Sequence, residues 1–213
     1  LLKKHLGIEK IHVGIGGSMG AYQLKEWELM ESGAFNNLVL LCTCARETAW
    51  GIAIHTAQRL ALEADATWKE DSESAGAKGL KAARAIGMLT YRNYETFVKT
   101  QTDDDFSKTD NFRASSYINY QGEKLMNRFN AYSYWLLTKA MDSHNLARNR
   151  GRQKPSGLLS ETVRMEDVLR KIKAKTVVIG IKSDILCPVA EQKFLASGIP
   201  GAIYKEMDSP YGH

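Results

Sequence analysis

A serine lies among glycines near the start of the sequence, in Gly16-Gly17-Ser18-Met19-Gly20. This spacing matches the G-x-S-x-G pattern, in which a sharp turn between a strand and a helix exposes a nucleophilic serine. Gly16 and Gly20 are expected to let the neighbouring strand and helix approach, while the turn holds Ser18 in a strained conformation. We therefore predict that Ser18 is a nucleophile. The Met19 backbone N–H, at the start of the next helix, is then an oxyanion donor.

A serine hydroxyl becomes a good nucleophile only when a base takes its proton, so an oriented histidine must accompany it. In proteins with this turn, an acid and then a histidine follow the serine along the chain. Asp184 and His213 satisfy that order, and each comes a few residues after a predicted strand. The less specific interpretations are that the glycines only join a strand to a helix, that Asp184 belongs to a turn or caps a helix, and that His213 is an incidental loop residue.

The other histidines and one further acid are weaker candidates for this triad. His5 and His12 precede the serine and violate the order, whereas His55 and His144 lie in a long helical stretch. Asp208 directly ends the strand that should deliver the histidine. We therefore expect none of these residues to take part in the chemistry. Nothing in the sequence has the spacing of a metal site.

The elements that must position these residues are strands at the two ends of the chain. Four short segments read as strands, and the inner pair are continuous aliphatic runs, as expected for parallel strands covered on both faces. The segments are Lys10–Ile15, Asn37–Cys42, Thr176–Ile181 and Ala202–Met207. Helices over Met19–Ser32 and Val189–Ser197 are predicted between them, with Gly33 and Gly198 just past their ends. Strand–helix–strand at each end predicts a parallel α/β sheet with right-handed crossovers.

The middle of the chain has helical patterns and no convincing strand. Ala77–Thr90 is rich in helix formers, and Leu125, Phe129, Tyr132 and Leu136 have the spacing of one helix face. We therefore expect an α/β core formed by residues 1–45 and 172–213, with residues 46–171 inserted as a helical lid.

Composition limits the class of protein. Of the 213 residues, 44% are hydrophobic and 25% charged, as in an ordinary globular domain. The longest apolar run is too short to span a membrane, and no secretory signal opens the sequence. The net charge of +5 is spread along the chain, so neither nucleic acid nor membrane is expected as a partner. Three cysteines without a disulfide or zinc spacing suggest a reduced, cytoplasmic protein.

Five separated stretches of the chain resemble homoserine O-acetyltransferases. They are Gly14–Gly20 with Gln23 and Glu26-Trp27, then Ala83–Arg92, then Tyr120-Gln121-Gly122 with Lys124 and Arg128-Phe129, then Ser183-Asp184 with Pro188 and Glu191-Gln192, and finally Tyr211-Gly212-His213. They occur in the family's order and extend over the whole chain. The fold that this resemblance implies is the α/β-hydrolase fold.

The resemblance also implies an activity. It is the transfer of an acetyl group from acetyl-CoA to the hydroxyl of L-homoserine, a step of methionine biosynthesis, through an acyl-enzyme on Ser18. Acetyl-CoA is then a substrate, no cofactor is bound permanently, and the enzyme is a cytoplasmic homodimer. Arg84 and Tyr91 match family positions that line the amino-acid pocket, where a guanidinium would clamp the homoserine carboxylate. From the residues alone, Arg84 reads as a solvated helix arginine.

Several alternatives remain open at this level. Water in place of homoserine would make the same machinery a serine esterase, and the donor could be succinyl-CoA or the acceptor serine. Compared with the family, strands before Lys10 and a segment after His213 are missing, so we expect the sequence to be part of a longer protein. A fragment that acts only as an interaction module is the third interpretation. A basic run at Arg148, Arg150, Arg152 and Lys154 is either a solvated loop or a contact for coenzyme A phosphates.

Overall fold

The structure is a computed structural model that describes residues 2–150 and 163–213. These residues form two compact units. The first unit comprises Leu1–Arg46, His144–Lys182 and Cys187–Asp208, and the second comprises Glu47–Ser143, Ser183–Leu186 and Ser209–His213.

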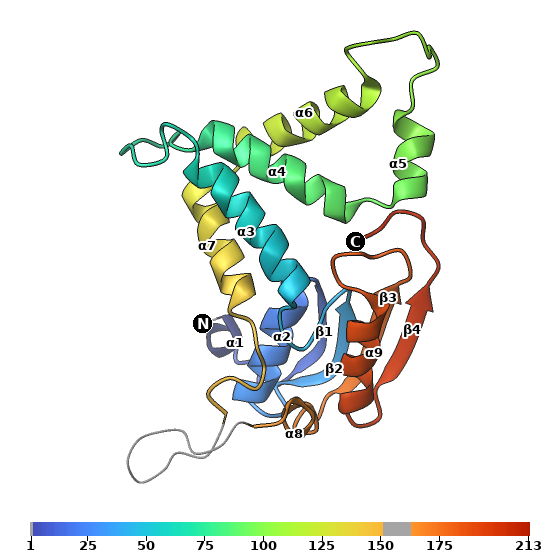
Figure 1. Cartoon of the computed structure of the whole chain (residues 1–213). Helices are drawn as coiled ribbons and strands as arrows, with labels where there is room; N and C mark the ends of the chain where they lie inside the picture. Colours follow the sequence, from blue (N-terminus) through green and yellow to red (C-terminus); the bar gives the residue numbers. More distant parts are fainter. Residues whose placement is uncertain (1, 151–162) are drawn as a thin grey trace. The chain divides into compact units, whose positions relative to one another are not determined.

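The first unit is built on a parallel sheet of four strands in the order β1-β2-β3-β4 (Figure 1). The strands are β1 (Ile11–Gly17), β2 (Phe35–Leu41), β3 (Lys175–Ile181) and β4 (Ile203–Met207). All four were predicted from the sequence, within two residues at each end. Gly16 pairs with Leu40, and Val39 pairs with Val177. Parallel pairing brings the carboxyl ends of all four strands to one edge, where α/β proteins place their reactive groups.

Helices α2 (Met19–Met30), α8 (Met165–Leu169) and α9 (Val189–Gly198) share one hydrophobic core with the sheet, and a short helix α1 (Leu2–His5) precedes β1. The core includes Leu38 and Leu40 of β2, Val178 of β3, Leu169 of α8 and Leu195 of α9, all completely buried. On the opposite face of the sheet the aliphatic side chains Val13, Ile15 and Ile203 are 40%, 70% and 53% exposed. These three residues belong to the edge strands, whereas Val39 and Val177 of the inner pair, for which the sequence predicted cover on both faces, are partly buried on this face.

A buried carboxylate ties distant parts of this unit together. Glu28 near the end of α2 is fully buried and accepts hydrogen bonds from the N–H groups of Gly33, Phe35, Lys173 and Ala174. These donors begin β2 and precede β3. A single side chain therefore satisfies backbone groups that would otherwise be buried without acceptors.

The second unit consists of five helices. They are α3 (Ala49–Glu63), α4 (Ala77–Tyr91), α5 (Tyr94–Gln101), α6 (Arg113–Met126) and α7 (Ala131–Asp142). Helix α4 packs against α3 and α6, and α3 packs against α7 (Figure 1). Three of the helices begin with a side chain that accepts hydrogen bonds from their first turn, namely Thr48, Asn93 and Asn130.

Some sequence expectations differ from the structure. Leu125 and Leu136 do not lie on one helix, because α6 ends at Met126 and Asn130 caps the start of α7. Gly33 has the expected positive φ of 81°, although α2 ends at Met30. Gly198 is the last residue of α9 and does not lie just past its end as predicted, and a Cβ there would lie 2.4 Å from the Leu169 side chain.

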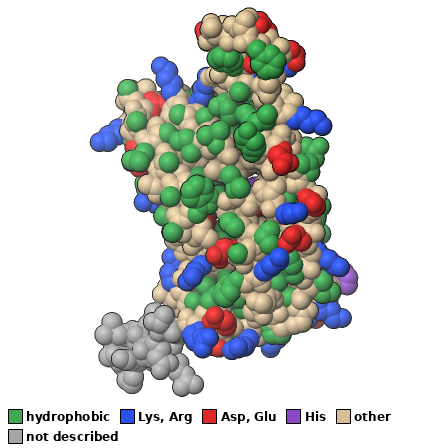
Figure 2. Space-filling view, turned by 45° about the vertical axis from the view of Figure 1, so that its right-hand side comes forward, with side chains coloured by type: hydrophobic (Ala, Val, Ile, Leu, Met, Phe, Trp, Pro, Cys, Tyr) green, Lys and Arg blue, Asp and Glu red, His purple; other side chains and the backbone are tan. Residues whose placement is uncertain are grey.

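The helical insertion is shorter than the predicted range of 46–171. Residues 144–150 and 163–182 belong to the first unit, because Leu146, Met165, Val168, Leu169 and Ile172 pack into the core of the sheet. The loops 183–186 and 209–213 belong instead to the helical unit. No helix in residues 2–150 or 163–213 combines the length and the apolar character that crossing a membrane requires. Figure 2 shows basic and acidic side chains interspersed on the face that it presents.

Candidate active site

The predicted nucleophile lies between β1 and α2. Ser18 has φ 51° and ψ −121°, a conformation that residues with a Cβ rarely adopt. Its N–H donates to the Leu41 carbonyl at 2.9 Å, and its carbonyl accepts from the first turn of α2. Met19 is the first residue of that helix, so its N–H has no intrahelical acceptor and lies where the helix dipole favours negative charge. This strand–turn–helix arrangement is the one predicted from the sequence.

Only one of the two flanking glycines is required for the predicted steric reason. A Cβ at Gly16 would lie 2.7 Å from the Gly20 carbonyl carbon and 2.8 Å from the Ala21 nitrogen. Because both atoms belong to the backbone of α2, they cannot move aside without displacing the turn. A Cβ at Gly20 would meet no heavy atom of the described residues within 4 Å, so the steric argument is wrong there.

The predicted acid and base lie together in the second unit. His213 Nδ1 is 2.8 Å from Asp184 Oδ2, and the side chain of Asp184 is completely buried. The other carboxylate oxygen, Asp184 Oδ1, accepts from the Leu186 N–H at 2.9 Å. A carboxylate held in this way fixes the tautomer of the imidazole and leaves Nε2 as its reactive atom. Asp184 is therefore neither a helix cap nor a turn residue alone.

Contacts between two loops, 183–186 and 209–213, explain how this pair is positioned. Ser183 Oγ donates to the Ser209 carbonyl at 2.6 Å and accepts from the Gly212 N–H at 3.1 Å, so it joins the two loops. Gly212 has φ 82°, and a Cβ there would lie 2.6 Å from the Tyr91 carbonyl oxygen. Glycine is required at position 212 both for its backbone conformation and for space.

The predicted substrate residues Arg84 and Tyr91 lie beside the histidine. The rings of Tyr91 and His213 stack with centroids 5.8 Å apart, and the Arg84 guanidinium carbon is 5.2 Å from the centroid of Tyr91. Arg84 Nε is buried and has no hydrogen-bond partner among the residues that the structure describes. Arg84 is therefore not the solvated helix arginine of the less specific interpretation, and its buried N–H could bind an anionic group.

Tyr134 of α7 also belongs to this cluster, although the sequence gave no reason to select it. Its phenol lies close enough to the Tyr91 phenol and the Arg84 guanidinium to interact with both electrostatically. Burial raises the pKa of Tyr91, and the positive charge of Arg84 opposes that rise. Burial also raises the pKa of Tyr134 well above its ordinary value. Both phenols therefore stay protonated at neutral pH and can act as hydrogen-bond donors or acceptors.

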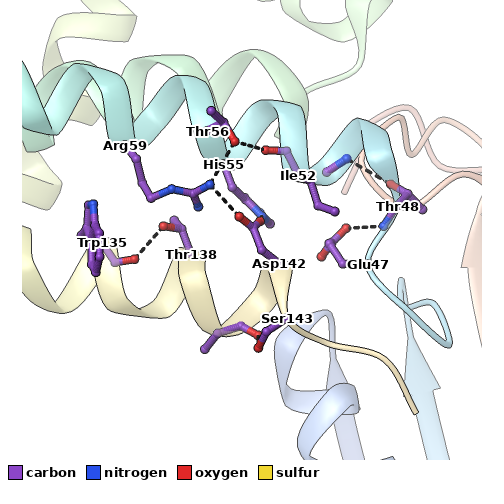
Figure 3. Close-up of polar contacts among 12 residues, drawn as sticks. Glu47, Thr48, Ile52, His55, Thr56, Arg59, Trp135, Thr138, Asp142 and Ser143 are labelled. Carbon is purple, nitrogen blue, oxygen red and sulfur yellow. Dashed lines mark hydrogen bonds and ion pairs between the residues drawn. The ribbon is translucent and has the colours of Figure 1, made fainter. Parts of the chain in front are cut away.

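A second histidine–carboxylate pair lies between α3 and α7 (Figure 3). His55 Nδ1 is 2.8 Å from Asp142 Oδ1, a distance equal to that in the Asp184–His213 pair. Here, however, Arg59 contacts Asp142 Oδ2 at 2.6 Å, so an arginine shares the carboxylate. All three side chains are largely buried. Since His55 and Arg59 come from α3 and Asp142 from α7, two helices that pack against each other, we interpret this network as a link between them.

The remaining candidates have structural explanations or are exposed. His144 stacks on Tyr22 with centroids 3.8 Å apart, and burial lowers its pKa to about 3. His12 and Asp208 are exposed, and Asp208 lies 3.5 Å from Lys182. In the basic run, Arg150 pairs with Glu26 at 2.6 Å, whereas Arg152 and Lys154 lie outside the described residues.

Known proteins are similar to this chain both in sequence and in fold. No protein-family model matches it. Over its full length it is 42% identical to a curated homoserine O-acetyltransferase from Cyclobacterium marinum, of which it covers 57%. The solved homoserine O-acetyltransferase from Bacillus anthracis superposes with a TM-score of 0.83 at 18% identity, and the chain covers 57% of it. An acetylester hydrolase from Corynebacterium glutamicum superposes over the full chain with a TM-score of 0.82 at 19% identity, 58% of that protein being covered.

The four parallel strands, the strand–turn–helix arrangement around Ser18 and these superpositions define an α/β-hydrolase fold with an inserted helical unit. The chain spans a little over half the length of the curated relatives that it matches. Those relatives are named homoserine O-acetyltransferase, so the resemblance inferred from the five sequence stretches is confirmed.

Proposed function

We propose that the protein carrying this chain transfers an acetyl group from acetyl-CoA to the hydroxyl of L-homoserine, through an acyl-enzyme on Ser18. The observation that supports this most directly is the buried Asp184–His213 pair, since its 2.8 Å contact leaves the imidazole oriented as a general base. The strained Ser18 turn supplies the nucleophile. The relatives named homoserine O-acetyltransferase supply the reaction class.

The chemistry runs in two half-reactions. In the first, His213 removes the proton of Ser18 as the serine oxygen attacks the thioester carbonyl, and the protonated imidazole then returns that proton to the departing coenzyme A thiolate. In the second, His213 removes the proton of the homoserine hydroxyl as its oxygen attacks the acyl-enzyme carbonyl, and the protonated imidazole then gives that proton to the departing Ser18 oxygen. The Met19 N–H stabilises the oxyanion in both steps.

The cluster of Arg84, Tyr91 and Tyr134 is proposed to bind the amino acid. The buried Nε–H of Arg84 is available for the homoserine carboxylate, and a charge-assisted hydrogen bond is among the stronger polar contacts. The ring of Tyr91 stacks on His213, so it would lie between the homoserine carboxylate at Arg84 and the homoserine hydroxyl at His213. We expect the active protein to be a homodimer, as the family resemblance implies.

The decisive experiment pairs two aspartates in the protein that carries this chain. Asp184→Asn should lower kcat by about 10⁴-fold, because an amide cannot hold the imidazole in the required tautomer. Asp208→Asn, at an exposed acid directly after β4, should keep wild-type kcat. Ser18→Ala should abolish both turnover and the initial burst of coenzyme A. A Ser18→Ala enzyme with more than a few per cent of wild-type activity would refute the proposal.

A serine esterase is the second candidate, because an apolar cavity borders the loop of the acid. The cavity has a volume of about 270 Å³ and is lined by Leu89, Arg92, Asn93, Tyr94, Phe97 and Ile185. Competition between homoserine and water for the acyl-enzyme separates the two functions. If acetate forms at the same rate with and without homoserine, the protein is an esterase, whereas O-acetylhomoserine as the main product supports the transferase.

A further inference from the structure

One face of α2, the helix that follows Ser18, carries side chains that contact the segment after β2. Ser18, Tyr22 and Lys25 recur at the spacing of a single helix face. Tyr22 Oη lies 3.1 Å from Cys44 Sγ. Lys25 Nζ lies 4.9 Å from the centroid of the Tyr22 ring. Tyr22 therefore joins this face to the chain directly after β2, and Lys25 lies against Tyr22 on the same face.

Lys25 is completely buried, which is unusual for a lysine. Its ammonium group donates to Thr43 Oγ1 at 2.8 Å and to the Cys44 carbonyl at 2.5 Å. Thr43 and Cys44 are themselves buried. Because desolvating an ammonium group costs free energy that its hydrogen bonds must offset, these acceptors have to be held in place.

Thr43, which accepts the hydrogen bond from Lys25, is itself hydrogen-bonded to Ser18. Its hydroxyl donates to the Ser18 carbonyl at 3.3 Å. A hydroxyl has one hydrogen, and an ammonium group can only donate, so the bond from Lys25 directs that hydrogen toward Ser18. Hydrogen bonds in such a chain polarise and strengthen one another.

Ser18 needs this support because its backbone is strained. A residue with a Cβ at φ 51° costs on the order of 1–3 kcal/mol and persists only where its surroundings determine it. Both its backbone groups are held from the same segment, the N–H by the Leu41 carbonyl and the carbonyl by the Thr43 hydroxyl. If this segment relaxes, the Ser18 hydroxyl and the Met19 N–H both move.

We propose that Lys25 and Thr43 are positioning residues, which act through the Ser18 carbonyl to hold the nucleophile in its reactive conformation. This inference rests on the proposed function only in taking Ser18 as the nucleophile. A misplacement of about 1 Å costs roughly 10²-fold in rate, so loss of this chain should slow acylation by about 10–100-fold.

The test compares Thr43→Val, which keeps the shape but removes the hydroxyl, with Thr43→Ser, which keeps the hydroxyl. Lys25→Met removes the ammonium group and keeps most of the stem, and Lys81→Met removes a lysine that pairs with an exposed glutamate. For each variant of the protein carrying this chain, the rate of covalent labelling by phenylmethanesulfonyl fluoride, kcat, the KM for homoserine and the Tm are measured.

We expect Thr43→Val and Lys25→Met to lower labelling and kcat by about 10–100-fold with an unchanged KM for homoserine. Thr43→Ser and Lys81→Met should stay within about threefold of wild type by the same argument. Equal losses in Thr43→Val and Thr43→Ser, or wild-type labelling of Thr43→Val, would overturn the inference. If Lys25→Met does not fold, the two Thr43 variants still decide the question. Labelling that persists in Ser18→Ala would instead refute the proposed function.

Discussion

Substitution of Gly212 tests how the base is positioned. An alanine there would carry the strain of a φ of 82°, about 1 kcal/mol. Its Cβ would also lie 2.6 Å from the Tyr91 carbonyl oxygen and 3.0 Å from the backbone at Arg92 and Asn93. A normal carbon–oxygen contact is about 3.3 Å or longer, so the loop must move by roughly 0.7 Å. His213 is the next residue and must move with it.

Since about 1 Å of misplacement costs roughly 10²-fold, Gly212→Ala should lower kcat by roughly 10–100-fold. Gly201→Ala is the matched control, because Gly201 has φ 67° and a Cβ there would meet no heavy atom of the described residues within 4 Å. Gly201→Ala should lose about 1 kcal/mol of unfolding free energy from backbone strain, and Gly212→Ala at least as much, which thermal melting reports as a few degrees of Tm. Only Gly212→Ala should lose activity. Equal kcat in the two variants would refute the packing of residue 212 against the end of α4.

Three further predictions concern buried ionisable groups, each measured by urea unfolding. Asp142→Asn should cost about 3–5 kcal/mol, because it leaves an arginine without its buried partner, whereas Asp104→Asn, 87% exposed, should cost less than about 1 kcal/mol; similar losses would contradict the linking role. The His144 pKa of about 3 lies below the unfolded value near 6.5, so the unfolded state binds the proton first and stability falls as pH drops from about 6.5 toward 3. His144→Phe should flatten this slope and His12→Phe should not, and identical slopes would contradict the assignment. Glu28→Gln should cost about 2–4 kcal/mol, since it leaves buried N–H groups without an anionic acceptor, and a loss below about 0.5 kcal/mol would show that those donors find other partners.

The features that could be predicted from the sequence are mostly those that depend on residues close together along the chain. The nucleophile turn depends on a few adjacent residues around Ser18, and the aliphatic run of β2 depends on side chains within one strand, so both can be read directly. The order of Asp184 and His213 after their strands was also sufficient to predict that the two side chains lie together. Their hydrogen bond is long-range in sequence, but parallel strands bring their carboxyl ends to the same edge.

What the sequence did not predict depends on contacts between distant segments. Tyr134 has the pattern of a helix-surface aromatic, and only its burial beside Tyr91 and Arg84 distinguishes it. Lys25 likewise reads as an exposed helix lysine, because its acceptors lie 18 and 19 residues further along the chain. The sequence also did not predict that the first unit resumes at residue 144. That boundary depends on whether Leu146 packs in the core of the sheet or in that of the helical unit, and the spacing of side chains does not decide between the two.

The pairing of β2 with β3 has a consequence for how the chain folds. Val39 pairs with Val177, 138 positions later, whereas Val13 pairs with Asn37 only 24 positions away. Closing the longer loop costs about 4 kcal/mol of chain entropy and the shorter about 3 kcal/mol, a difference that slows the longer closure by roughly tenfold. Contacts among α3, α4, α6 and α7 form within the longer loop and shorten its effective length. We therefore expect refolding in two phases, in which helical signal appears before the burial of Phe35 and Leu38 completes the sheet.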